Sequence, residues 1–250
     1  MSTALFTRSL LLGLVSLAPR LAGADLLPAH ADAEVGLASA LRLHGDDPVT
    51  QKAAYFKANL EDNWDSGYYK AKGRVRYDAR YDGHNPYSQE ARDDYRFSAD
   101  WRHLYWGQYL GDGEVTVGWQ QVVWGRADEL RVLDQVNPID YREGVTALLE
   151  DSRIAVPMVR LTQPVGEWEV EALWINDFLK NQAPAQGSEF DAPLFAVPDP
   201  DLFVIDSKPD YSGQKGFSYG MSANGRIGSV DASFVALNAR QQDPVYAVCL

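Results

Sequence analysis

Residues 68–81 of the chain read YYKAKGRVRYDARY, and polar and apolar side chains alternate along this stretch. The even positions carry the polar set: Tyr68, Lys70, Lys72, Arg74, Arg76, Asp78 and Arg80. The odd positions carry the apolar set: Tyr69, Ala71, Gly73, Val75, Tyr77, Ala79 and Tyr81. A period of two is the period of a β-strand, and the run is about twice as long as an ordinary strand. The stretch predicts a transmembrane β-barrel strand, with the polar face toward the lumen and aromatic rings at both membrane interfaces.

Other segments alternate in the same way, and we expect nine strands, at residues 34–44, 52–61, 66–82, 94–106, 114–124, 152–162, 167–176, 215–223 and 226–238. From the second strand onward, tight and long links alternate. The tight links are 62–65, 107–113, 163–166 and 224–225, and the long links include 83–93, 125–151 and 177–214. Outer-membrane barrels have short periplasmic turns and longer extracellular loops. The sequence therefore predicts an all-β chain that forms part of an antiparallel transmembrane β-barrel.

The N-terminus predicts export. Residues 1–24 have the pattern of a cleaved secretory signal peptide, with Arg8, an apolar core at 9–18 and the cleavage site Ala22-Gly23-Ala24. We therefore expect residues 25–250 to be a barrel domain in the cell outer membrane. The net charge of −12 argues against a nucleic-acid partner. The single cysteine, Cys249, excludes a Cys-based zinc site, and we expect no metal, no cofactor and no catalytic residue.

The link at 125–151 has a pattern of its own. Apolar residues three apart between 130 and 136 have helical spacing, and Asn137-Pro138 followed by Asp140 fits a helix N-cap and first turn. We expect two short helices that fold into the lumen as a plug, or lie outside as a cap. The polar residues of this link are candidate substrate contacts: Arg126, Asp128, Arg131, Asp134, Asn137, Asp140, Arg142 and Glu143. The alternative is that Asp134, Arg142 and Asp151 only pin the loop to the barrel wall.

The charged faces of the predicted strands supply candidate pore-lining residues. The basic candidates are Lys70, Lys72, Arg74, Arg76, Arg80, Arg96 and Arg102, and the acidic candidates are Glu167, Glu169 and Glu171. A basic wall opposite an acidic wall would create a transverse field across the pore. The alternative is that these charges solvate the lumen and pair with one another. Glu169 and Glu171 are about 7 Å apart by strand rise, which also fits a glycosidase acid/base pair, but this spacing is common in strands and we expect no enzyme.

The stretch VVWGRADELRVLDQVNPIDYREGVTALLEDSRI, at residues 122–154, carries several irregular motifs. They are V-V-W-G at a strand end, A-D, V-L-D-x-V-N-P, R-E, and D-S-R-I at the start of the next strand. Asp93-Asp94-Tyr95-Arg96 upstream, and Gly166-Glu167-Trp168 and Leu173-Trp174-Ile175 downstream, fit the same pattern. Together they resemble a family of large Gram-negative outer-membrane barrel proteins, known only as domain of unknown function thirteen-oh-two.

The resemblance implies a location and a fold, with outer-membrane lipid and the barrel-assembly machinery as partners, but no activity and no catalytic residue. Members look genetically linked to permeases of the resistance–nodulation–division type. This link implies an inner-membrane permease as a further partner and hydrophobic or lipid-like solutes. Members are also longer than this chain, so the resemblance predicts an N-terminal part that lacks C-terminal strands and does not insert stably alone.

The sequence thus predicts a porin-like outer-membrane channel or transporter. The alternative is a periplasmic or secreted β-sandwich that binds carbohydrate through its aromatic side chains. The sandwich keeps the signal peptide and the alternation but does not explain the sorting of short and long links. Membrane fractionation distinguishes the two, because a sandwich is released by osmotic shock and a barrel requires detergent.

Overall fold

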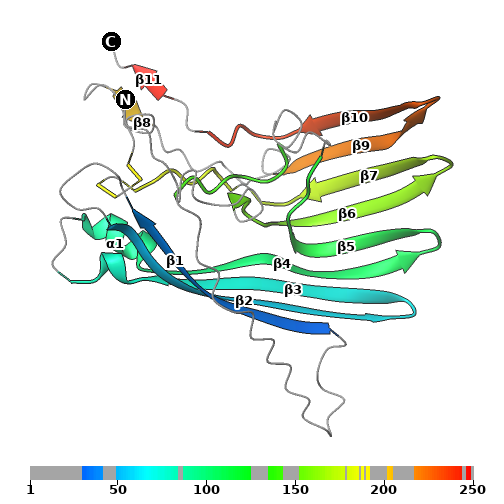
Figure 1. Cartoon of the computed structure of the whole chain (residues 1–250). Coiled ribbons are helices and arrows are strands. Elements are labelled where there is room, and N and C mark those ends of the chain that lie inside the picture. The colour runs from blue at the N-terminus through cyan, green and yellow to red at the C-terminus, as the bar shows by residue number, and fades with distance from the viewer. Residues whose placement is uncertain are drawn as a thin grey trace, which may run out of the picture. The chain divides into compact units, whose positions relative to one another are not determined.

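The computed structural model describes residues 30–41, 49–83, 87–124, 135–142, 152–177, 179–185, 187–188, 190–191, 202–204, 217–243 and 246–248. Nine strands form one antiparallel sheet in the order β1-β2-β3-β4-β5-β6-β7-β9-β10 (Figure 1). The first five are β1 (His30–Leu41), β2 (Val49–Trp64), β3 (Gly67–Asp78), β4 (Phe97–Leu110) and β5 (Gly113–Gln120). The others are β6 (Val156–Val165), β7 (Trp168–Ile175), β9 (Ser218–Ile227) and β10 (Val230–Asn238). The prediction of nine strands in one all-β sheet is confirmed.

The sheet as described is open. Its order begins with β1 and ends with β10, and the described residues contain no pairing between these two strands. A separate pair joins β8 (Leu202–Val204) and β11 (Tyr246–Val248). The helices are a 3₁₀ turn, η1 (Ala79–Tyr81), and α1 (Gln89–Tyr95). Within the described part of the chain, neither helix has the length and apolar content needed to cross a bilayer.

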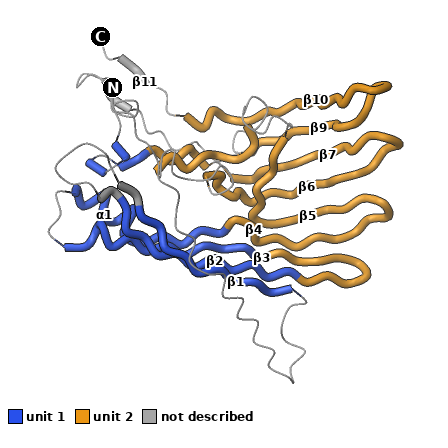
Figure 2. The backbone as a smooth tube through the Cα atoms, viewed as in Figure 1, with its two compact units in different colours: residues 1–61, 71–101, 184–196 blue, residues 62–70, 102–183, 197–250 orange. Residues whose placement is uncertain are grey.

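The chain divides into two compact units (Figure 2). Unit 1 comprises Met1–Glu61, Ala71–Trp101 and Pro184–Ala196, and unit 2 comprises Asp62–Lys70, Arg102–Ala183 and Val197–Leu250. The core of unit 1 is a stack of aromatic rings around α1, made of Tyr81, Tyr87 and Tyr95 with Phe190 packed against them. The core of unit 2 is an aliphatic cluster that includes Trp124, Met158 and Leu173.

The four hairpin turns that the structure describes belong to unit 2, where they lie together at one end of the strands (Figure 2). Each turn has two residues, at 65–66, 111–112, 166–167 and 228–229, whereas the other links are longer. Three of them place a glycine at positive φ, namely Gly111, Gly166 and Gly228. The left-handed conformation costs glycine little, so the chain reverses within two residues. The predicted alternation of tight and long links is therefore confirmed.

The tight turn predicted at 224–225 is wrong. β9 continues through these residues to Ile227, with Asn224 paired to Glu169 on one side and to Ser233 on the other. Gly225 lies under the Trp168 ring, because a Cβ there would approach Trp168 Cδ2 to 2.4 Å. The glycine therefore makes room for a cross-strand aromatic side chain, and the turn falls at the next glycine in the sequence.

The predicted strand ends at 82 and 94 are also wrong. Asp78 ends β3, because its carboxylate accepts the Arg80 N–H and caps η1. Ser88 likewise accepts the Ala91 N–H and caps α1, which places Tyr95 inside a helix. Both side-chain caps favour helical turns over further strand pairing in this link, and the aromatic core of unit 1 forms there.

The faces of β3 are inverted relative to those of a water-soluble sheet. Arg74, Arg76 and Asp78 are only 8%, 5% and 0% exposed, whereas Val75 and Tyr77 are 39% and 42% exposed. The charged face is therefore the buried one, and the apolar face is open. This arrangement is the one that the alternation of residues 68–81 predicts.

Strict alternation along residues 94–106 predicts His103 and Tyr105 on the same face as Trp101, and in β4 this prediction is wrong. The Tyr105 ring lies edge-on to Tyr68, on the polar side, and His103 contacts Tyr105. Leu104 and Trp106 are the exposed apolar residues of this part of the strand. The contacts between aromatic rings on the polar side account for this placement.

Candidate functional site

The polar face of unit 2 begins near the hairpin turns, where three strands contribute to one aromatic and acidic cluster. Tyr68 on β3 donates from its hydroxyl to Glu114 Oε2 on β5 at 3.0 Å. Its ring contacts Tyr105 and Tyr109 of β4, with ring centroids 6.1 and 5.6 Å away. This end of the face presents hydroxyls, a carboxylate and ring edges together.

A charged group lies next along the same face. Arg160 on β6 makes two hydrogen bonds with Glu171 on β7, from Nη2 to Oε1 at 2.7 Å and from Nε to Oε2 at 3.0 Å. The indole Nε1 of Trp124 donates to the same Oε2 at 3.0 Å. Both carboxylate oxygens of Glu171 are thus occupied, and its side chain is only 7% exposed. The pair has the bidentate geometry that makes Arg–carboxylate contacts strong and specific.

The same two strands become apolar toward their other end. Val156 and Met158 of β6 and Leu173 and Ile175 of β7 are buried, and Trp124 and Val136 pack on them. Trp124 is 2% exposed. It also comes close to β9, since a Cβ on Gly220 would lie 2.7 Å from Trp124 Cη2. A short stretch of chain outside the sheet therefore covers the apolar end of this face.

Residues 135–142 are part of this cover, and Asn137 holds them in place. Its Oδ1 accepts the Val122 N–H at 2.7 Å, and its Nδ2 donates to Gln120 O at 2.9 Å and Ile154 O at 2.8 Å. The helix predicted to start at Asn137-Pro138 is wrong, because 136–142 contain only bends, bridges and a turn. The physical reason is that the asparagine amide bonds to distant backbone groups rather than to the N–H groups that follow it.

Residues 135–142, which we call the docked segment, are also paired through their backbone on both sides. Asp140 N–H donates to Ser152 O at 2.7 Å, and Ile154 N–H donates to Pro138 O at 2.8 Å, in an antiparallel bridge. Tyr141 N–H and Gln182 O, and Gln182 N–H and Ile139 O, pair on the other side at 2.8 Å each. We call these three stretches, 138–141, 152–154 and 181–182, the cap ribbon.

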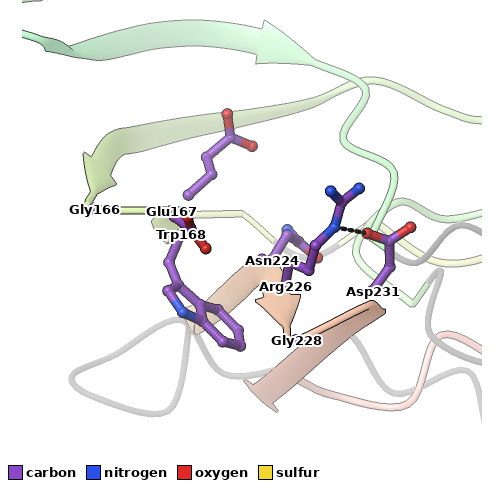
Figure 3. Close-up of a pocket in the computed structure, with 9 residues that line it drawn as sticks. Gly166, Glu167, Trp168, Asn224, Arg226, Gly228 and Asp231 are labelled. Atoms are coloured by element: carbon purple, nitrogen blue, oxygen red, sulfur yellow. Dashed lines mark hydrogen bonds and ion pairs between the residues drawn. The ribbon is translucent and has the colours of Figure 1, made fainter.

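A shallow hollow of about 720 Å³ lies at the turn end of β6, β7, β9 and β10. Figure 3 shows Glu167 and Trp168 from one hairpin and the ion pair of Arg226 with Asp231 from the other. Arg226 Nε lies 3.4 Å from Asp231 Oδ1, and both side chains are more than half exposed. The described residues hold no group of three or more acidic, histidine or cysteine side chains placed to bind a metal ion.

Residues 40–248 match the sequence profile of the family described as "Protein of unknown function (DUF1302)". The chain belongs to this family. The match covers every strand from β2 to β11 and the whole of the docked segment. The predicted family membership is confirmed. No curated protein and no solved structure matches the chain.

In this DUF1302 member, the predicted basic residues lie in several settings. Arg74 is 3.4 Å from Asp100, and Arg76 is 2.8 Å from Asp78, which also accepts the Lys52 N–H. Lys70 and Lys72 are half-buried on β3 and make interactions of their own. Arg74 and Arg76 thus each pair with an acidic side chain.

The other basic candidates are not strand residues or are tied to backbone. Arg80 belongs to η1, with its guanidinium 5.3 Å from the Tyr87 ring centroid, and Arg96 is the exposed C-cap of α1. Their expected positions on strand faces are therefore wrong, for the capping reasons given above. Arg102 is on β4, and its Nη1 donates to Arg153 O at 3.0 Å.

The acidic candidates divide by burial. Glu167 is a turn residue and Glu169 is exposed, whereas Glu171 is buried against Arg160. Glu169 and Glu171 therefore sit in different surroundings although they share a strand face. The transverse field between basic and acidic walls stays a prediction, because most of the basic residues belong to unit 1 and the acidic ones to unit 2.

Among the plug candidates, Asn137, Asp140 and Arg142 lie in the described segment. Arg142 donates to Asp140 from its backbone N–H, Nε and Nη2, at 2.7–3.0 Å. The remaining candidates fall outside the described residues: Arg126, Asp128, Arg131, Asp134 and Glu143. Asn137 has a docking role, whereas Asp140 and Arg142 bond to each other within the segment. Asp134 and Asp151 lie outside the described residues, so the alternative that Asp134, Arg142 and Asp151 pin the loop stays a prediction.

Arg160, Glu114 and Trp124 were not predicted as partners in the polar face. A signal was present, since Arg160 interrupts the apolar run VPMVRL at a position that alternation assigns to the inner face. Trp124 had no such signal, because it follows β5 and reaches Glu171 only through the fold of the intervening chain.

Proposed function

We propose that this chain contributes its sheet to the wall of a β-barrel in the outer membrane of a Gram-negative cell. The barrel would act as a channel or transporter, with the charged strand face lining the lumen. The observation that carries the proposal is the inverted burial of β3, where Arg74 and Arg76 are enclosed and Val75 and Tyr77 are open. Water favours the opposite arrangement, whereas a lipid bilayer on the outside and water on the inside favour this one.

Unit 2 has the same inversion over several neighbouring strands. Its exposed large apolar side chains include Leu104, Trp106, Val117, Trp119, Leu161, Trp174, Tyr219, Met221 and Phe234. They come from β4, β5, β6, β7, β9 and β10, so they form a face rather than isolated positions. A contiguous apolar surface of this kind is unusual on a soluble monomer. A closed barrel of hydrogen-bonded strands with an apolar outer face is one of the two backbone arrangements that lipid accepts.

The opposite face supports an aqueous lumen. Tyr68, Glu114, Arg160 and Glu171 bond to one another or to neighbours, so the polar groups are largely satisfied within the protein. The two-residue turns at one end of unit 2 have the length of periplasmic turns, and the longer links have the length of extracellular loops.

The proposal extends to the solute class. The lumen face would present aromatic and charged groups such as Tyr68, Glu114 and Arg160, whereas Met158 and Leu173 are covered by the docked segment. Hydrophobic or lipid-like solutes handed on to or from an envelope permease are the class that we propose. The resemblance of the motif-bearing segment to permease-linked members supports the same class by association.

Fractionation of the protein produced from its own gene tests the location. We expect it in the outer-membrane fraction, resistant to osmotic shock and released by detergent. A matched pair of variants tests the faces. Leu161→Lys puts a charge on the apolar face and should cost about 2–4 kcal/mol near the membrane midplane, which lowers the amount of assembled protein. Thr162→Lys should assemble normally, because Thr162 pairs with Glu114 and Glu171 across the strands. Release by osmotic shock, or equal assembly of both variants, would contradict the proposal.

The second candidate is the carbohydrate-binding sandwich. Exposed tryptophans such as Trp106, Trp119 and Trp174 favour it, because indole rings stack on sugars. A sandwich, however, packs its apolar face against a second sheet, and here that face is open. The same fractionation decides between the two, since the sandwich would appear in the shock fluid and bind immobilised glycans.

A further inference from the structure

The cap ribbon has more connections than a loop needs in order to join β5 to β6. We infer that the ribbon is a fixed constriction across the proposed lumen face rather than a gate, and that Asn137 is the positioning residue that holds it. The conductance test of this inference rests on the proposed function, whereas the hydrogen-exchange test does not. The inference narrows the expectation of a plug in the lumen, because it assigns the described part of that loop to the static wall.

Asn137 acts as a substitute peptide group. An asparagine amide offers two donors and one acceptor oxygen, and here both donors and the oxygen are engaged with backbone groups. Its three partners, Gln120, Val122 and Ile154, flank the ends of β5 and β6. The residue is 1% exposed, so water does not compete for these bonds. The side chain therefore closes a gap where the two neighbouring strands separate.

Residues 135–142 are tied from the far side as well. Asn181 Oδ1 accepts the Ile139 N–H at 2.7 Å, and Asn181 Nδ2 donates to Asp243 at 2.6 Å. Gln242 Nε2 donates to Val136 O at 3.2 Å. The link after β7 and the chain after β10 thus both hold residues 135–142. Lifting this segment would require these bonds to break together with those of Asn137.

The underside of the docked segment adds an apolar contact. Val136 is 2% exposed and belongs to the same buried cluster as Val122 and Trp124. Lifting the segment would expose this cluster and remove the cover of Met158 and Leu173 on the sheet. A mobile gate usually has few buried contacts and many exposed backbone bonds, and this segment has the reverse.

Hydrogen exchange on the full chain tests the clamp without any assay of transport. Asn137→Ala should speed exchange in peptides that contain Val122 and residues 139–141 by about tenfold or more, as the loss of one or two hydrogen bonds implies. The hairpin peptides should not change. The control is Asn59→Ala, which removes an exposed bond to Asp32 and should leave the ribbon unaffected. Unchanged exchange in Asn137→Ala, or exchange in the unaltered ribbon as fast as in exposed loops, would overturn the inference.

A covalent lock tests whether the ribbon must move. Ile139 and Arg153 face each other as a non-hydrogen-bonded antiparallel pair, whose Cα atoms are typically about 4.5 Å apart, within disulfide range. The double variant Ile139→Cys, Arg153→Cys is made with Cys249→Ser, which removes the single natural thiol. The protein is purified in detergent from outer membranes and measured in planar bilayers.

We expect the oxidised lock and its reduced form to have the same single-channel conductance and open probability. Asn137→Ala should make the current noisier or larger, and oxidation of the lock in that background should restore the original trace. Closure or permanent opening on oxidation would show a gate and overturn the inference. If none of these proteins conducts, the proposed channel function fails, while the exchange experiment still decides the role of Asn137.

Discussion

The two ends of the polar face in unit 2 are built from the same strands but have opposite characters. Near the hairpin turns, Arg226 and Asp231 form an ion pair that is 63% and 55% exposed. Toward the cap ribbon, Trp124 and Asn137 are almost completely buried. The strands alternate alike at both ends, so the difference comes from the chain that docks on one end only. Similar polar contacts should therefore contribute very differently to stability at the two ends.

The largest effect is expected for Glu171→Ala at the covered end. It leaves the Arg160 guanidinium and the Trp124 N–H without their shared partner. Removing one member of a buried pair costs about 3–5 kcal/mol, and partial exposure of Arg160 places the result near the lower limit. Urea unfolding in detergent measures it. Glu169→Ala, two residues away and exposed, is the control and should change stability by less than about 0.5 kcal/mol. Equal losses of stability in Glu171→Ala and Glu169→Ala would contradict the difference between buried and exposed contacts.

Gly220→Ala tests the packing of Trp124 at the same end. The new Cβ would lie 2.7 Å from Trp124 Cη2 and 2.9 Å from Leu237 Cδ1, so side chains must shift at a cost of about 1–3 kcal/mol. Thermal unfolding of Gly220→Ala, Trp124→Phe and the double variant forms a cycle. The double variant should lose less than the sum of the single variants, because the smaller ring relieves the overlap. If the losses of stability simply add, residues 220 and 124 do not contact each other.

At the open end, Gly166→Ala should cost about 1 kcal/mol. Here the cause is backbone conformation, since Gly166 has φ +63° and no atom stands within 4 Å of the added Cβ. Gly166→Asn should lose less stability than Gly166→Ala, because asparagine tolerates the left-handed region better than alanine. Equilibrium unfolding of the two variants side by side provides the check. The same loss in both would point away from backbone strain as the cause.

The smallest effect is expected for Arg226→Ala in the exposed ion pair of Figure 3. Such pairs contribute about 0–1 kcal/mol, and salt weakens them further. We expect a change within about 0.5 kcal/mol that disappears at high ionic strength. A loss comparable to that of Glu171→Ala would show that the turn end is as enclosed as the ribbon end, and the contrast between the ends would fail.

Strand number, strand order and the charged face of β3 were predictable from the sequence. They depend on local alternation and on turn residues, which act over a few positions in the chain. Several errors occurred where side chains bond to backbone groups. Asp78 and Ser88 accept N–H groups two and three residues ahead and cap helical turns at the predicted strand ends, whereas Asn137 binds distant backbone groups instead of starting a helix.

The sequence by itself thus determined the all-β class, the inverted faces of β3, the alternation of short and long links, and the family. Only the tertiary structure decided that Arg160 meets Glu171 and Trp124, and that residues 135–142 lie over one end of the polar face. The physical reason is the distance along the chain between the residues that decide each feature. Alternation is a property of adjacent residues, whereas the Trp124–Glu171 contact spans 47 positions and exists only once β5, β6 and β7 have paired.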